Sequence, residues 1–129
     1  MFPMSQTTHK ILVAVYGSLK KGFHNDVHLK QANSFVGTGI ISGFEMYDLG
    51  SFPMIVPGEG PVNVEVYDVS DNVFRSLDCL EGFPHFYDRK RTVVTYDNSD
   101  RQEKVWVYFG RHDQVKGSNK VDNGNWVKK

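Results

Sequence analysis

Alternation of apolar and polar positions is the strongest pattern in this chain and predicts β-strands. Valine occupies every second position in residues 62–67, and apolar residues alternate with others again in residues 104–109. This period of two is typical of a strand with two distinct faces. Residues 11–16 form a continuous apolar run instead, which is typical of a strand buried on both faces.

Turn-forming residues connect further strand candidates. Residues 92–96 are β-branched and aromatic, and the polar residues 97–100 after them favour a turn. We therefore expect a hairpin with the strand at residues 104–109. Weaker strand patterns cover residues 34–41 and 44–48, with Ser42 and Gly43 between them.

Helical patterns are few. The clearest begins at Ser70 or Asp71 and ends at Leu80, with a capping side chain at its start, apolar residues at helical spacing and Gly82 just past its end. A second helix with a thin apolar face is expected at residues 25–33. The predicted fold class is α+β, a small, mixed, mainly antiparallel sheet or β-barrel with one or two helices.

Length and composition limit the domain organisation. A chain of 129 residues is the size of one domain. We place this domain at residues 1–114. Residues 115–129 are rich in Lys, Asn and Gly, with Trp126 as their one large apolar side chain, and are expected to form a polar C-terminal tail.

Charge and cysteine content restrict the partners. Fifteen basic and fifteen acidic residues give a net charge of zero, so no overall field attracts nucleic acid or a membrane surface. A small neutral or zwitterionic ligand fits better. The single cysteine, Cys79, cannot form an internal disulfide. The first residues contain no apolar run that resembles a signal peptide or a membrane span, so we expect a cytoplasmic protein.

The end of the first predicted strand has a pattern suited to ligand binding. Gly17 and Ser18 follow the apolar run directly, and glycine permits a tight turn whose backbone N–H groups can face a ligand oxygen. The same residues also fit a plain turn from strand to loop.

Glu81 is the candidate acid/base. It lies in the last turn of the predicted helix, where the helix dipole and apolar neighbours would raise the pKa of its carboxyl group. A carboxyl with a pKa near neutrality can accept a proton and later return it. Arg89 and Arg91 lie close in sequence and would lower that pKa if either reached Glu81. A solvent-facing or arginine-paired glutamate is therefore the alternative interpretation.

Taken together, several ordered segments resemble the gamma-glutamylcyclotransferase superfamily, and most closely its short gamma-glutamylamine cyclotransferase-like branch. The resemblance covers about residues 11–110. The segments are Tyr16-Gly17-Ser18-Leu19-Lys20-Lys21-Gly22, Ser51-Phe52-Pro53-Met54-Ile55-Val56-Pro57-Gly58, Val64-Glu65-Val66-Tyr67, and Leu77-Asp78-Cys79-Leu80-Glu81-Gly82 followed by Tyr87-Asp88-Arg89.

The resemblance implies a small barrel whose cavity holds a gamma-glutamyl group and releases it as 5-oxoproline and a free amine. It implies that Glu81 is the catalytic acid/base and that Tyr16, Gly17, Ser18 and Leu19 bind the glutamyl part through their backbone. The substrate supplies its own nucleophile, so no cofactor is expected. The family often has glycine where this chain has Val64, which would narrow the cavity.

Tyr87 and Tyr108 complete the predicted substrate-binding residues. Tyr87 matches the aromatic residue that follows the catalytic glutamate in the family. Tyr108 is a further pocket candidate, although an aromatic residue in such a strand more often belongs to the core. His24 and His28 are four residues apart, but the sequence places no third ligand with them, so no metal site is expected. A non-catalytic module that binds a small metabolite is the alternative function, and a purely structural protein is a third.

Overall fold

The strands and helices follow the chain in a simple order. The computed structural model describes residues 11–17 and 34–127. The elements within these residues are β1 (Ile11–Val15), β2 (Ser34–Asp48), β3 (Pro53–Val69), α2 (Asp71–Glu81), β4 (Asp88–Tyr96), β5 (Gln102–Phe109), the 3₁₀ helix η1 (His112–Val115) and β6 (Asn119–Val121).

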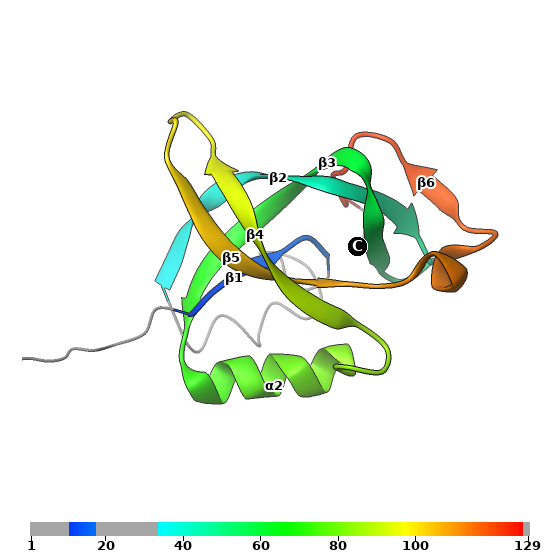
Figure 1. Ribbon diagram of the computed structural model, residues 1–129, viewed down its shortest axis with the longest axis horizontal. Helices are drawn as coiled ribbons and strands as arrows, with labels where there is room; N and C mark the ends of the chain where they lie inside the picture. Colours follow the sequence, from blue (N-terminus) through cyan, green and yellow to red (C-terminus); the bar gives the residue numbers. More distant parts are fainter. Residues whose placement is uncertain (1–10, 18–33, 128–129) are drawn as a thin grey trace, which may run out of the picture.

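The strands close into a barrel. The sheet order is β3-β1-β5-β4-β2, and β2 also pairs with β3, so each of these five strands has a neighbour on both sides (Figure 1). β6 extends the sheet from β2. Among the described pairs β1–β5 is parallel and the others are antiparallel. The predicted fold class, a small and mainly antiparallel barrel of α+β type, is confirmed.

Two strands are longer than the sequence pattern predicts. The weak candidates at residues 34–41 and 44–48 are one strand, β2, which continues through Ser42 and Gly43 with a bulge in its pairing to β3. β3 begins at Pro53, nine residues before the valine alternation that predicted it. Bulges shift the side-chain alternation from one face to the other, so the period-two pattern breaks although the strand continues.

The helix α2 has the predicted caps. The Ser70 hydroxyl accepts a hydrogen bond from the Val73 backbone N–H, and Gly82 ends the helix with φ 67° and ψ 34°. Glycine adopts this left-handed conformation without the penalty that a Cβ brings. Within the described residues no helix is long and apolar enough to cross a membrane. The helix predicted at residues 25–33 lies outside them.

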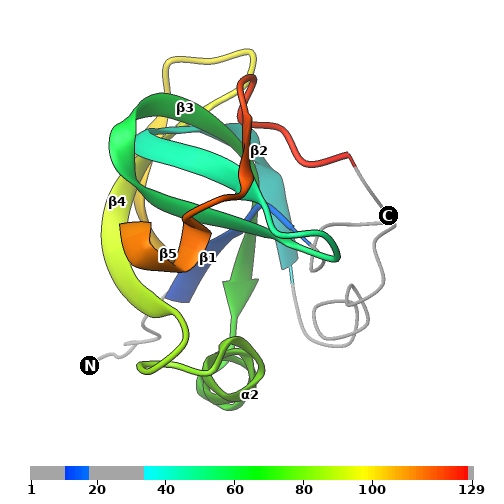
Figure 2. The same cartoon turned by 90° about the vertical axis from the view of Figure 1, so that its right-hand side faces the viewer.

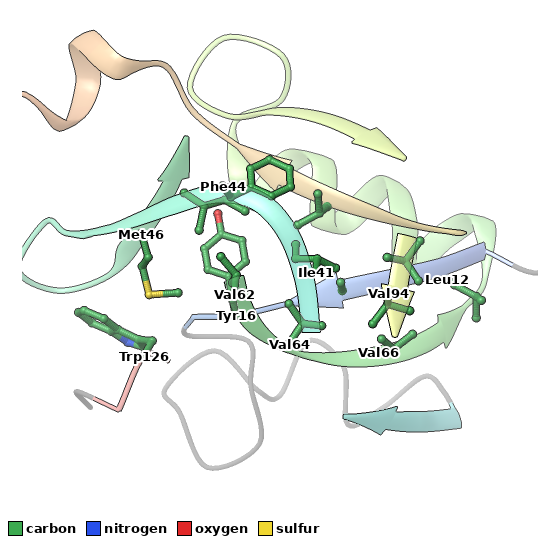
Figure 3. Packing of buried hydrophobic residues seen from close by; sticks show 14 of the residues in the cluster. Leu12, Tyr16, Ile41, Phe44, Met46, Val62, Val64, Val66, Val94 and Trp126 are labelled. Atoms are coloured by element: carbon green, nitrogen blue, oxygen red, sulfur yellow. The ribbon is translucent and has the colours of Figure 1, made fainter. Parts of the chain in front are cut away.

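The apolar side chains form two layers. One fills the barrel and includes Leu12, Ala14 and Tyr16 from β1 and the residue after it (Figure 3). The other lies between the barrel and α2, which runs beneath it (Figure 2), and includes Val13 and Val15. β1 is thus buried on both faces, as its continuous apolar run predicted, because alternate residues enter different layers.

The C-terminal segment differs from the expected polar tail. β6 pairs with β2 between Met46 and Asp48, and the Trp126 side chain is 3% exposed in the barrel core (Figure 3). The polar composition of the segment concealed this, because only a few of its residues, Val115, Val121 and Trp126, pack in the apolar layers. The chain is therefore packed onto the barrel as far as Trp126.

Trp126 is expected to contribute strongly to stability. Removing a buried tryptophan side chain leaves a cavity, so Trp126→Ala should lower the free energy of unfolding by about 3–5 kcal/mol, measured by urea denaturation. Val127→Ala is the control, because Val127 is 71% exposed, and should change stability by less than about 0.5 kcal/mol. Equal effects of the two changes would show that the segment is not part of the packed core.

Candidate active site

The strand directions bring the predicted site residues to one end of the barrel. β1 and β5 are parallel, so Tyr16 and Gly17 after β1 lie at the same end as Tyr108 near the end of β5. β4 is antiparallel to β5, which places Tyr87, just before β4, there as well. α2 runs in the same direction as β1, and both end on the right in Figure 1.

The Tyr16–Gly17 turn contacts two neighbouring strands, β5 and β3. The Tyr16 hydroxyl donates to the Tyr108 backbone carbonyl at 2.7 Å. A Cβ at position 17 would lie 2.9 Å from Pro53 Cγ and Cδ, so Gly17 permits a backbone approach that a larger residue would prevent. Ser18 and Leu19, the other two predicted backbone ligands, lie outside the described residues.

Tyr87 connects the segment before β4 to the start of β3. Its side chain is buried, and its hydroxyl donates to the Pro53 carbonyl oxygen at 2.9 Å. Pro53 therefore contacts the Gly17 backbone through its ring and accepts from Tyr87 through its carbonyl. Sequence analysis had no role for Pro53 itself, although it lies in one of the segments on which the family resemblance rests.

Glu81 is the last residue of α2 and its carboxyl group is largely enclosed by protein. Burial raises the pKa of this group from 4.5 to about 7. Its charge also acts, as a cause secondary to burial, to raise the pKa of Tyr16, Tyr87 and Tyr108. Glu81 and the three tyrosines therefore interact electrostatically.

Arg89 does not pair with Glu81. Its guanidinium forms two bonds to the Asp78 carboxylate, with Nε–Oδ1 at 2.8 Å and Nη2–Oδ2 at 3.2 Å. Arg91 is exposed on the same face of β4, with its guanidinium carbon 6.0 Å from the centre of the Trp106 ring. No ion pair to Glu81 occurs within the described part of the chain, which excludes the arginine-paired alternative there.

Asp78 is a site residue that sequence analysis missed. Besides binding Arg89, it accepts a hydrogen bond of 2.7 Å from the Tyr108 hydroxyl. Tyr108 is buried in the layer between the barrel and α2, and its hydroxyl pKa is also raised by the charge of Glu81, after burial and Asp78. The signal in the sequence was the spacing of Asp78 and Glu81, because residues three apart lie on one face of a helix.

The remaining candidate groups from the sequence, the metal ligands, Cys79 and Val64, have other positions or lie outside the described residues. Within residues 11–17 and 34–127 no group of three His, Cys, Asp or Glu side chains has the geometry to hold a metal ion. His24 and His28 lie outside these residues. Cys79 is exposed on α2 rather than packed inside. Val64 is 2% exposed and lines a polar hollow of about 220 Å³ beside Asp97, at the end of the barrel where β4 turns into β5.

Comparisons with known proteins place this architecture in a family. A profile described as "Gamma-glutamyl cyclotransferase, AIG2-like" matches residues 13–128. The crystal structure of an AIG2-like protein from Mus musculus superposes with a TM-score of 0.78 at 25% identity, covering 93% of this chain and 90% of that one. The chain therefore belongs to the AIG2-like gamma-glutamylcyclotransferase family.

Curated relatives agree with this assignment. A protein of Methanocaldococcus jannaschii, with a provisional gamma-glutamylcyclotransferase name, is 36% identical over 100 residues, which cover 75% of this chain and 82% of that protein. The gamma-glutamylcyclotransferase family protein YtfP of Escherichia coli K12 is 29% identical over 115 residues, covering 89% of this chain and 95% of its own length. The resemblance found in the sequence is thus confirmed at the level of the family.

Burial of Glu81 should make stability depend on pH. Between pH 4.5 and about 7 the folded protein binds more protons than the unfolded chain, so folding becomes less favourable as the pH rises. Glu81→Gln cannot ionise. It should be more stable than the unaltered protein at pH 8 by about 1–3 kcal/mol, and this advantage should disappear as the pH falls to 4.5.

Urea denaturation at the two pH values measures this difference. The matched control is Glu59→Gln, because Glu59 is exposed and its replacement should leave stability nearly unchanged at either pH. A stability difference for Glu81→Gln that does not vary with pH would contradict the burial of an ionisable carboxyl at this position.

Proposed function

We propose that this protein is a cyclotransferase that converts a gamma-glutamyl amine or related amide into 5-oxoproline and a free amine, with Glu81 as the general acid/base. One observation carries the proposal. The Glu81 carboxyl has a pKa of about 7 and is enclosed at the end of the barrel where the Tyr16–Gly17 turn also lies. A carboxyl poised near the working pH can both take and return a proton.

The first step is deprotonation and ring closure. Glu81 in its ionised form accepts a proton from the α-ammonium group of the substrate. The free α-amine then attacks the γ-carbonyl carbon and forms the new C–N bond of the five-membered lactam. Nucleophile and electrophile belong to one molecule, so no protein nucleophile is needed, in agreement with the exposed position of Cys79.

The second step is departure of the amine. The tetrahedral intermediate breaks its bond to the original amide nitrogen, and the protonated Glu81 gives its proton to that nitrogen. Glu81 then accepts the second hydrogen of the ring nitrogen and passes it to the amine, so both protons lost by the α-ammonium end on the departing amine, which leaves as an ammonium ion. No water, oxidant or cofactor enters the balance, and Glu81 returns to its ionised form.

The protein's second contribution is to hold the substrate in a folded conformation. Well-oriented intramolecular reactions reach effective molarities of about 10⁵ M or more, so holding the α-amine against the γ-carbonyl supplies a large share of the acceleration. The Gly17 turn would bind the glutamyl part through backbone N–H groups, and the same groups would stabilise the developing oxyanion. Ser18 and Leu19 are assigned to this turn on the family resemblance.

The tyrosines would form the walls of the site rather than donate protons to the substrate. Tyr16 and Tyr87 each donate their hydroxyl hydrogen to a backbone carbonyl, and Tyr108 donates to Asp78. Tyr16 and Tyr87 also hydrogen-bond to each other through their side chains, so it is the tyrosine rings that would contact the ligand. The proposed partner is therefore one small gamma-glutamyl molecule, with no nucleic acid or membrane involved.

The test is formation of 5-oxoproline from a panel of gamma-glutamyl amines, gamma-glutamyl dipeptides and glutathione. At least one substrate should be converted, at a rate that rises with pH through about 7 as Glu81 ionises. Glu81→Gln should lower the rate by about 10²–10⁴-fold, the usual contribution of a general acid/base.

Two controls separate the roles of the residues. Glu59→Gln makes the same chemical change at an exposed site, and Cys79→Ser removes the one thiol; both should retain activity. No product from any substrate, or equal product from Glu81→Gln, would refute the mechanism. Binding of a panel member by calorimetry without turnover would instead identify the non-catalytic binding module.

A further inference from the structure

A single arginine binds the first of two carboxylates in the last turn of α2. Asp78 and Glu81 are three residues apart and so lie on one side of the helix. Arg89 comes from the start of β4, which packs beside them through its pairing with Tyr108. The guanidinium binds Asp78 through two nitrogen atoms, and among the described residues Glu81 forms no ion pair.

The surroundings of Arg89 explain why it binds Asp78. The guanidinium carbon lies 4.4 Å from the ring centre of Phe74, 4.3 Å from that of Phe83 and 4.6 Å from that of Trp106. Three aromatic faces at this distance hold a cation in place. The Arg89 and Asp78 side chains are only 19% and 20% exposed, so the pair is partly desolvated and its two parallel bonds are stronger than those of a surface pair.

A hydrogen bond orients the carboxylate of this pair. Asp78 Oδ1 accepts from both the Tyr108 hydroxyl and Arg89 Nε. Tyr108 belongs to β5 and Arg89 to β4, so Asp78 joins α2 to two strands of the barrel. Its carboxylate is held in one orientation while it neutralises the arginine.

We propose that Asp78 is a positioning residue that keeps Arg89 away from Glu81, and so preserves the Glu81 carboxyl as a group that exchanges its proton. The contacts between Asp78 and Arg89 support the positioning of Arg89. Its catalytic consequence rests on the proposed function, because only an acid/base role makes the absence of a cation useful.

Within residues 11–17 and 34–127, the other titratable groups that interact electrostatically with Glu81 are uncharged near neutral pH. They are the hydroxyl groups of Tyr16 after β1, Tyr87 before β4 and Tyr108 in β5, whose pKa values burial raises. Arg91, further along β4, is the next cation on the same face and lies over the outer part of Trp106. Arg89 is therefore the cation that would change the charge next to Glu81 if Asp78 released it.

The test is a titration of the Glu81 side-chain carboxyl by carbon-13 NMR, with Glu81→Gln to assign its signal. Asp78→Asn should lower the titration midpoint by about one pH unit or more, because a freed guanidinium favours the ionised carboxylate. Asp78→Asn combined with Arg89→Gln should return the midpoint close to that of the unaltered protein. Asp71→Asn, an exposed aspartate on the same helix, should leave it unchanged.

Arg89→Gln alone should shift the titration midpoint of Glu81 in the opposite direction. Asp78 then carries an unbalanced negative charge three residues from Glu81, so the midpoint should rise. This variant also keeps the test decisive if Asp78→Asn does not fold. A midpoint that is unchanged in Asp78→Asn, that stays low in the double variant, or that does not rise in Arg89→Gln would overturn the proposal.

The titration is independent of turnover, so the two proposals can fail separately. If no substrate is converted by any variant, the proposed function fails while the midpoints still decide the role of Asp78. Where turnover is measured, the acid limb of the rate profile should move with the NMR midpoint. A purely structural aspartate would lower the rate without moving that limb.

Discussion

The parallel pairing of β1 with β5 is the constraint on which the candidate site depends. In a barrel whose other described pairs are antiparallel, it sends the ends of two strands in one direction. The turn after β1 and the end of β5 then meet, and the start of β4 joins them. Two hydrogen bonds, from Tyr16 to the Tyr108 carbonyl and from Tyr87 to the Pro53 carbonyl, connect these segments. The backbone at this end is thereby held before any ligand arrives.

Much of this arrangement follows from local sequence, and the rest depends on contacts between distant residues. The apolar run of β1, the hairpin of β4 and β5, and the Ser70 and Gly82 caps of α2 are all encoded by neighbours in the chain. Bulges in β2 obscured the length of that strand. The packing of Trp126 against the barrel could not be seen in a polar segment, because its partners lie far away in sequence.

The candidate site shows the same division. Glu81 and the Tyr16–Gly17 turn were identified because each has a local signature, the end of a helix and the end of a strand. The partner of Arg89 was not predicted, because its closeness in sequence to Glu81 suggested only that carboxylate. In the structure Arg89 pairs with Asp78, and its guanidinium packs against the rings of Phe74, Phe83 and Trp106, which come from three segments of the chain. Such a choice is made by tertiary packing and has no short-range pattern.

Burial of the Glu81 carboxyl opposes folding. The neighbouring ion pair between Asp78 and Arg89 provides stabilising contacts that offset this cost. An enclosed carboxylate would ordinarily attract the nearest cation, which would stabilise the protein and lower the pKa of the carboxyl. Here the cation is bound by a second carboxylate one helical turn earlier, and that pair contributes contacts with three aromatic rings and Tyr108. The end of α2 thus separates two tasks between two acidic residues. Asp78 fastens the helix to the barrel, and Glu81 retains a carboxyl that remains protonated at a higher pH than an exposed glutamate would.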